Sequence, residues 1–184
     1  MISFEKLSYV RRTVDGRYQL SVKALQLGRS FENSIDQREL IETTLKQLRD
    51  STGESVYFYV RDGDNRVCLM GEDSPQSLRV YRKIGVLIPM DSTSISEVLR
   101  TYEGGAPAGG YEPASLARHS IGAYDPLTSS VSAPVFDRKS ALIGVIAVSG
   151  PVGRFDAGNP ETLEHIGSAA GRLSRLLGFL PPAG

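Results

Sequence analysis

Residues 129–149 read SSVSAPVFDRKSALIGVIAVS, and this stretch decides the fold class. Ser129 to Phe136 and Ala141 to Ser149 are two runs of strand-forming residues, and the polar segment between them has the composition of a turn. The second run is apolar from Leu142 to Val148 except at Gly144, so both of its faces are expected to be buried. The stretch therefore predicts a hairpin whose second arm is a central strand of a sheet.

Strand and helix signals on both sides of this hairpin complete the fold. Val56, Phe58 and Val60 recur at a period of two, which predicts a strand, and the polar turn that follows can return the chain antiparallel. A third strand is expected to end at a proline, over residues 84–89. Apolar residues at helical spacing predict helices over about 20–31, 34–53, 94–102 and 159–178. This order of elements predicts an α+β fold, in which helices pack on an antiparallel or mixed sheet.

Three of the predicted helices begin with recognisable capping residues. Residues 34–37 and 94–97 each match the capping box, in which Gln or Glu follows a serine after three positions. Asn159 and Pro160 are typical of the N-cap and the first helical position of the last helix. These signals predict where each helix begins.

The first thirty residues differ in character from the rest of the chain. Asp15 and Gly16 separate two short strand-like runs, which is a strong hairpin signal because glycine accepts the positive φ of a tight turn. Arg11, Arg12 and Arg17 make this hairpin basic, and its only acid is Asp15 in the turn. The sequence therefore predicts a basic hairpin followed by a helix.

The composition limits the class of protein. The 184 residues are enough for one ordinary domain, or one domain with a small appendage, and 40% hydrophobic against 23% charged residues is typical of a globular protein. The formal net charge of zero argues against a chain that coats nucleic acid over its whole surface. No apolar run approaches the length of a membrane span, and no hydrophobic signal segment follows Met1. We therefore expect a cytoplasmic protein without a membrane partner.

The cysteine and histidine patterns speak against metal and cofactor sites. The single cysteine, Cys68, rules out a disulfide framework and a multi-cysteine zinc or iron–sulfur site, and by pattern it is an interior strand residue. His119 and His165 form no closely spaced pair of the kind that binds a metal. We expect no metal and no cofactor.

Serines in the quoted hairpin are candidates for binding a ligand. Ser149 ends the second arm, but its surroundings do not match the Gly-x-Ser-x-Gly motif of hydrolases, so a binding role is favoured over a nucleophilic one. Alternation sends Ser130 and Ser132 to one face, where buried hydroxyl groups would need partners or a ligand. Two other interpretations remain open: Ser149 simply ends its strand, and the face of Ser130 and Ser132 is exposed to solvent.

Four short motifs along the chain together carry a family resemblance. They are GRYQL with ALQLG in residues 16–28, IGVLIPM in 84–90, SAPVFD in 132–137 and IAVSGPVGR in 146–154. In this order they resemble the isocitrate lyase regulator (IclR) family of bacterial transcription factors, whose signature reads "AAPVFD … lsvSGP..R". The resemblance runs from about Leu7 to Gly178.

The resemblance implies a domain organisation and a function. Members of the family have a winged helix-turn-helix, a linker helix and an effector-binding domain of GAF-like fold, and they bind a small organic or aromatic acid as homodimers or homotetramers. In this chain it places a remnant of the winged helix-turn-helix at residues 1–20, the linker helix at 21–33 and the effector-binding domain at 34–180. The scanning and recognition helices are expected upstream of Met1. The wing would then contact the DNA backbone through Arg11, Arg12 and Arg17. Such contacts bind phosphates and read no bases.

The same resemblance assigns the effector contacts position by position. The family's strand-end serine falls on Ser149, and its pocket serine two residues earlier falls on Ala147. The expected ligand-binding residues are Ser94, Ile95, Ser120, Asp125, Ser130, Ser132, Ala147 and Ser149. Because residues 120–123 replace an acidic cluster of the family and leave Asp125 as the nearest acid, we expect an anion or a neutral polar ligand.

We therefore expect the effector-binding and oligomerising part of an IclR-type regulator, and no enzyme. One alternative is a stand-alone GAF-like metabolite-binding module that acts through a protein partner. A less favoured alternative is a small enzyme of the same fold. The nearest such enzymes are GAF-like methionine sulfoxide reductases, which need several cysteines where this chain has one.

Overall fold

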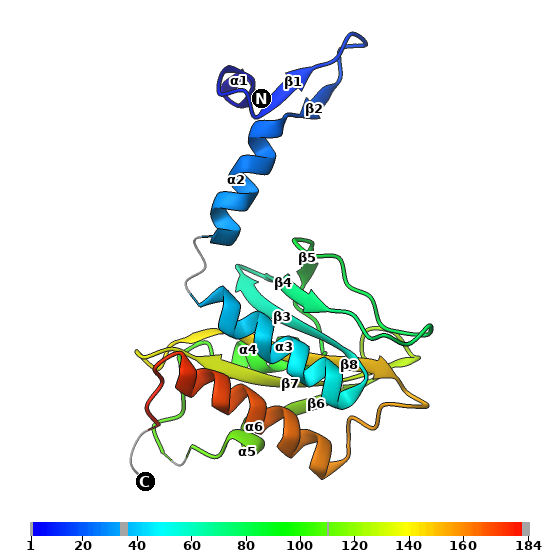
Figure 1. Cartoon of the computed structure of the whole chain (residues 1–184), viewed down its shortest axis with the longest axis vertical. Coiled ribbons are helices and arrows are strands. Elements are labelled where there is room, and N and C mark those ends of the chain that lie inside the picture. Colours follow the sequence, from blue (N-terminus) through cyan, green and yellow to red (C-terminus); the bar gives the residue numbers. More distant parts are fainter. Residues whose placement is uncertain (1, 34–36, 110, 182–184) are drawn as a thin grey trace. The chain divides into compact units, whose positions relative to one another are not determined.

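A computed structural model describes residues 2–33, 37–109 and 111–181 (Figure 1). The chain divides into two compact units, residues 1–38 and 39–184. The capping box expected at residues 34–37 lies outside the described residues except for Gln37.

The smaller unit holds the basic hairpin and one longer helix. Its elements are α1 (Ile2–Lys6), β1 (Val10–Arg12), β2 (Tyr18–Leu20) and α2 (Val22–Asn33). The two strands pair antiparallel, and Gly16 adopts a φ of +84° in the turn between them, which is the conformation that favours glycine there. The hairpin and the helix after it are therefore present where the sequence predicts them.

The larger unit is built on one six-stranded sheet. Its strands are β3 (Ser55–Asp62), β4 (Asn65–Glu72), β5 (Leu87–Pro89), β6 (Arg118–Ile121), β7 (Thr128–Phe136) and β8 (Leu142–Pro151). The spatial order is β5-β4-β3-β8-β7-β6, and every neighbouring pair is antiparallel. Two local hairpins, β3–β4 and β7–β8, are thus joined at the centre of the sheet by β3 and β8.

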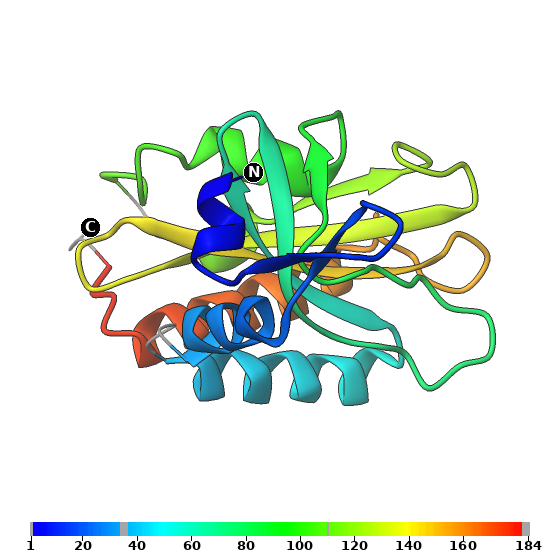
Figure 2. The ribbon, with the colours of Figure 1, turned by 90° about the horizontal axis from the view of Figure 1, so that it is seen from above.

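Helices cover both faces of this sheet. The helices of the larger unit are α3 (Arg38–Thr52), α4 (Ser94–Thr101), α5 (Pro113–Leu116) and α6 (Pro160–Leu176). Figures 1 and 2 show α3 and α6 side by side on one face and α4 on the other. The short α5 contacts α6 and β7. This arrangement confirms the α+β class and makes the sheet antiparallel throughout the described strands.

The central position predicted for the second arm of the quoted hairpin is confirmed. All residues of β8 from Gly144 to Gly150 are buried, because helices cover both faces of the sheet around it. Gly144 interrupts the apolar run for a steric reason: a Cβ atom placed there would lie 2.3 Å from Cζ of Phe58 on β3. Close approach of the two central strands thus requires glycine at this position.

One edge of β7 is only partly paired with another strand. β6 pairs with Ser129–Ser132, so the last residues of β7 extend beyond it. In this part Pro134 has no N–H to donate, and the N–H of Phe136 donates to Oγ of Ser174 on α6 over 3.1 Å. The side chain of Ser174 also donates to the Ala170 carbonyl within the helix, over 2.8 Å.

An ion pair between an exposed arginine and a buried glutamate lies at the end of β8. Arg154 donates from Nε and Nη2 to the two carboxylate oxygens of Glu54, over 2.6 and 2.8 Å. Glu54 lies just before β3 and is 2% exposed, so the arginine supplies the charge partner that its burial requires. The arginine of the family signature therefore has a structural explanation in this chain.

Three local expectations differ from the structure. The third strand is shorter than residues 84–89, because Gly85 adopts a φ of +78° and only Leu87–Pro89 pairs with β4. The capping box at residues 94–97 is wrong: Thr93 is the N-cap residue of α4, without a side-chain cap, and Ser94 is fully buried. The short elements α5 and β6 were not predicted, since four residues show no clear period. The beginning of α6 is confirmed, because Oδ1 of Asn159 accepts from the N–H of Glu161 over 2.8 Å.

Candidate functional site

Serines from several elements meet on the sheet face that carries α4. Ser120 on β6 is the cross-strand partner of Ser130 on β7, and Ser130 is the cross-strand partner of Ser149 on β8. Side chains of direct cross-strand partners lie on the same face of a sheet. These three serines therefore form a row across three strands, and two of them were predicted as site residues on the quoted hairpin alone.

Hydrogen bonds join the row to the first turn of α4. Oγ of Ser94 lies 3.0 Å from Oγ of Ser130 and 2.9 Å from Oγ of Ser132, and Oγ of Ser120 lies 3.1 Å from that of Ser130. The N–H of Ser94 donates to Oγ of Ser120 over 3.0 Å. The face of Ser130 and Ser132 is thus buried, not exposed, and the hydroxyl groups meet their need for partners among themselves.

A small cavity lies beside these serines. Its volume is about 20 Å³, which is room for about one water molecule. Thr93, Ile95, Ser120, Ser130 and Ser149 contribute to its lining. The hydroxyl of Ser149 has no hydrogen-bond partner among the described residues, in contrast to that of Ser130.

Arg66 on β4 also lines the cavity and is almost completely buried. Its two terminal nitrogens donate to the carboxylate of Asp91 over 2.6 and 2.8 Å, and Nη1 also contacts Oγ1 of Thr93 and Oγ of Ser96. The remaining nitrogen, Nε, is buried and has no hydrogen-bond partner among the described residues. A buried N–H without a partner is unusual in a native protein and calls for an explanation.

The acid that pairs with Arg66 stays ionised at neutral pH. Burial alone would raise the pKa of Asp91, but the hydrogen bonds from Thr93 and Ser96 and the positive charge of Arg66 outweigh it. The pKa of Asp91 therefore lies below its usual range. The ion pair makes the arginine a fixed positive group at the cavity wall.

A second arginine and a tyrosine close the cavity. The guanidinium carbon of Arg82 lies 4.6 Å from the ring centre of Tyr124, and that of Arg66 lies 5.7 Å from the same ring. Both distances are within the range of a cation–π interaction. All three residues line the cavity, whose lining includes no carboxylate. The site therefore combines two positive groups with several hydroxyl groups.

The predicted site residues divide into two sets in the structure. Ile95, Ser120, Ser130 and Ser149 line the cavity, and Ser94 and Ser132 support it through the hydroxyl contacts described above. Ala147 is fully buried in the core under α4 and does not line the cavity. Asp125 also lies outside the lining, where its Oδ1 accepts from the N–H of Leu127 over 2.8 Å and shapes the loop between β6 and β7.

Arg66, Arg82 and Tyr124 were missed by sequence reasoning. One signal for Arg66 was available, because it shares the period-two phase of Cys68 and Met70 on β4, and all three side chains are buried. An arginine in the buried phase of a strand needs a charge partner and marks a site worth testing. Arg82 and Tyr124 lie outside strands and helices and carry no such signal.

The arginines of the N-terminal hairpin are exposed and held by local contacts. Arg11 donates to Oε1 of Gln19 over 3.1 Å, and Arg12 donates to the Gly16 carbonyl over 3.3 Å. Arg17 pairs with Asp15 over 2.8 Å. The hairpin therefore presents three guanidinium groups to solvent on one short element.

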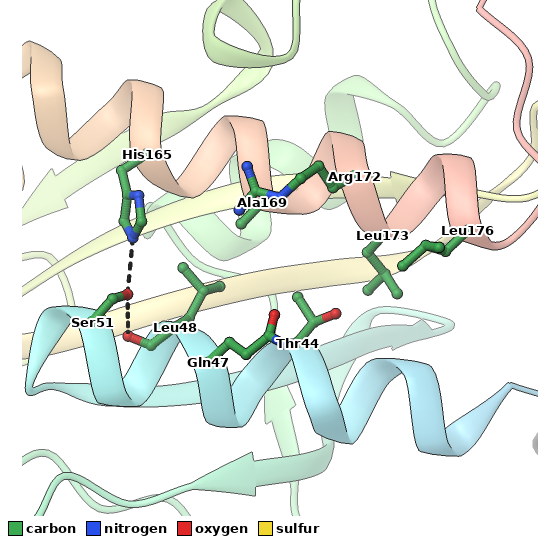
Figure 3. A pocket seen from close by; sticks show the side chains of 9 residues that line it. All are labelled: Thr44, Gln47, Leu48, Ser51, His165, Ala169, Arg172, Leu173 and Leu176. Carbon is green, nitrogen blue, oxygen red and sulfur yellow. Dashed lines mark hydrogen bonds between the residues drawn. The ribbon is translucent and has the colours of Figure 1, made fainter.

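A separate hollow of about 340 Å³ lies between α3 and α6 (Figure 3). Its lining is partly apolar, with Leu48 and Leu173, and Ser51 contacts Nε2 of His165 across it over 2.9 Å. None of the predicted site residues lies in this hollow.

The described residues include no group of three or more His, Cys, Asp or Glu side chains that could hold a metal ion. Nor is any described helix both long and apolar enough to cross a membrane.

No family model matches the chain. The chain is 24% identical over 205 residues to the HTH-type transcriptional regulator KdgR of Dickeya chrysanthemi, covering 96% of this chain and 67% of that protein. It is 25% identical over 195 residues to the HTH-type transcriptional regulator XynR of Escherichia coli, covering 90% and 76% of the two chains.

Solved structures of IclR-type regulators have a fold similar to that of this chain. The crystal structure of IclR from Thermotoga maritima matches with a TM-score of 0.69 and 19% identity, covering 97% of this chain and 83% of that chain. The curated relatives named here are regulators of transcription and not enzymes, in agreement with the expectation from the sequence. The resemblance carried by the four sequence motifs is thereby confirmed: the chain is a relative of IclR-type transcriptional regulators and has the fold of their C-terminal domains.

Proposed function

We propose that this chain is the effector-binding and oligomerising part of an IclR-type regulator that acts in the cytoplasm. In this proposal residues 34–180 bind a small organic or aromatic acid, residues 21–33 are the linker helix, and residues 1–20 are the remnant of a winged helix-turn-helix. Binding of the acid changes how the regulator binds DNA. The exposed arginines of the basic hairpin support the DNA contact, since guanidinium groups pair with phosphates.

The observation that carries the effector site is the convergence of polar side chains on one cavity. Ser120, Ser130 and Ser149 come from three strands, and the first turn of α4 closes the site from above the sheet. Four of the eight positions assigned by the family resemblance line this cavity. A few convergent polar groups in a concave, mostly buried setting are typical of a small-molecule site.

Ligand binding is tested by thermal unfolding and calorimetry with a panel of short-chain and aromatic carboxylic acids and their amides. A ligand at a hundred times its Kd adds about 2.7 kcal/mol to the stability, which corresponds to an increase in Tm of several degrees. Ser149→Ala is expected to weaken binding about fivefold by removing one hydrogen bond. The matched control is Ser51→Ala on α3, outside the cavity, which leaves the affinity unchanged. No binding by any compound of the panel would contradict the proposed function.

The subunit contact is tested on the linker helix. Leu25 and Leu27 of α2 are more than half exposed within their own unit, and exposed apolar side chains on a helix favour contact with a partner. Sedimentation is expected to show a homodimer or homotetramer that Leu25→Glu combined with Leu27→Glu dissociates. A monomeric wild-type chain would contradict this part of the proposal.

A further inference from the structure

The buried nitrogen of Arg66 is the starting point. Both terminal nitrogens of this side chain are held by Asp91, Thr93 and Ser96, which leaves Nε as the donor that still needs an acceptor. Arg66 is 2% exposed, so bulk water does not meet this need. A ligand oxygen in the cavity that Arg66 lines would do so.

Arg82 supplies a second guanidinium with available hydrogen-bond donors at the same cavity. It donates from Nη1 to the Tyr81 carbonyl over 3.1 Å, and it pairs with no carboxylate in the described part of the chain. Arg66 has Asp91 as its counter-charge, so the charge left over at the cavity is the one on Arg82. One excess positive charge with no acid in the lining fits a ligand with one negative charge.

The cavity as it stands is too small for any such ligand, and Tyr124 is the side chain that can move. The ring stacks over both guanidinium groups, yet the residue is 52% exposed and lies on the loop between β6 and β7. The loop backbone is fixed by the bond from Gly122 N–H to the Thr128 carbonyl and by Asp125. Rotation of this one exposed side chain would leave the loop backbone in place, and such a rotation is a fast motion.

We propose that Arg66 and Arg82 form the anion subsite of this cavity and that Tyr124 is its stopper. The inference rests on the proposed function and adds the chemistry of recognition. The carboxylate of a monoanionic ligand displaces the Tyr124 ring, accepts from Nε of Arg66 and from the guanidinium of Arg82, and places the rest of the ligand near the Ser149 hydroxyl. In the complex, charge-assisted hydrogen bonds from the two arginines to the carboxylate replace their cation–π contacts with Tyr124. A neutral amide forms only weaker hydrogen bonds with the arginines, so the acid binds more tightly than its amide.

The first experiment measures binding of small probes to the full chain by NMR. Formate, acetate and benzoate are compared with formamide, acetamide and benzamide, at up to about 100 mM for the smallest, where fragments of this size bind. The acids are expected to shift the Arg66 Nε–H resonance in a saturable way and to bind at least about tenfold more tightly than their amides. Arg82→Gln is expected to weaken acid binding at least about tenfold, whereas the exposed Arg79→Gln, on the same segment and outside the cavity, leaves it unchanged.

The second experiment reports on the stopper. The chain has no tryptophan, so Tyr124→Trp introduces a single fluorophore. Its emission is expected to shift to the red when benzoate displaces the ring into water, and Leu176→Trp on α6 is expected to show no shift. Tyr124→Ala removes the group that competes with the ligand and is expected to bind benzoate about three- to tenfold more tightly.

The outcomes separate this inference from the function on which it rests. Amides that bind as well as acids, an Arg66 Nε–H resonance that stays fixed at saturation, or acid binding that is unaffected by Arg82→Gln would overturn the anion subsite while leaving a ligand site in place. Weaker benzoate binding by Tyr124→Ala would overturn the stopper. If none of the probes binds, both the anion subsite and the proposed function fail.

Discussion

Replacing Asp91 with asparagine tests the ion pair that fixes Arg66 at the cavity wall. The substitution keeps the size of the side chain and one oxygen acceptor but removes the charge opposite an arginine whose side chain is 3% exposed. Two charge-assisted hydrogen bonds, of 2.6 and 2.8 Å, are weakened or lost. Breaking a buried ion pair by removing one partner costs about 3–5 kcal/mol. Because the side chain of Asp91 is 28% exposed and water can replace part of its contacts, we expect the lower end, about 3 kcal/mol.

Urea unfolding of Asp91→Asn beside the wild type measures this cost. With an m value of about 2 kcal/mol/M, a loss of 3 kcal/mol moves the midpoint by about 1.5 M. Glu103→Gln is the matched control, because it breaks the exposed ion pair with Arg61 in the same way, and it is expected to cost less than about 1 kcal/mol. If Asp91→Asn costs no more than this control, the reasoning about the buried pair is refuted.

The pH dependence gives a second check on the same residue. The pKa of Asp91 is lower in the folded chain than in the unfolded one, so its contribution is complete at neutral pH and is lost as the pH falls through the folded pKa. A protonated aspartate carries the same charge as asparagine. The difference in stability between wild type and Asp91→Asn is therefore expected to shrink at a pH below about 4, the unfolded pKa of an aspartate. A difference that stays constant to lower pH would contradict this assignment.

Three further experiments test the core and the serine cluster. Ser94→Ala leaves the buried Ser132 hydroxyl without its partner and is expected to lower the free energy of unfolding in urea by about 1–3 kcal/mol. The double variant with Ser132→Ala is expected to cost less than the sum of the two single changes. Additive costs would contradict the pairing. Gly144→Ala places a Cβ atom against the ring of Phe58 and is expected to cost about 2–3 kcal/mol, so an unchanged urea midpoint would contradict the steric argument. Burial raises the pKa of the Cys68 thiol to about 12, so iodoacetamide at pH 8 is expected to label it only after unfolding, and rapid labelling of the folded chain would contradict its burial.

Much of the fold could be predicted because its signals are local. The hairpin of β7 and β8 is recognisable from two apolar runs and a polar turn, and Asn159 with Pro160 marks the beginning of α6. The capping box at Ser94 failed for a tertiary reason. In the structure that serine is a buried hydrogen-bond partner of Ser130 and Ser132 and does not cap the helix. This role depends on contacts between residues far apart in the sequence, which a local pattern does not contain.

The candidate site was only half predictable for the same reason. Alternation on β7 places Ser130 and Ser132 on one face, and the structure confirms that this face is buried. Their partners Ser94 and Ser120 come from other elements, so the hydroxyl groups meet only when the folded chain places β6 and α4 beside β7. The partner of Arg66 lies 25 positions further along the chain, and only the folded chain brings the two together.

The last residues of β7 have a consequence for how two copies of this chain can meet. Unpaired N–H groups at a sheet edge invite a strand from another molecule, which leads to sheet extension and aggregation. Here Pro134 has no N–H to offer, and the N–H of Phe136 is already taken by Ser174. This part of the β7 edge therefore offers no free N–H to a strand of another copy, so the subunit contact proposed above is expected to lie on other surfaces, such as the linker helix.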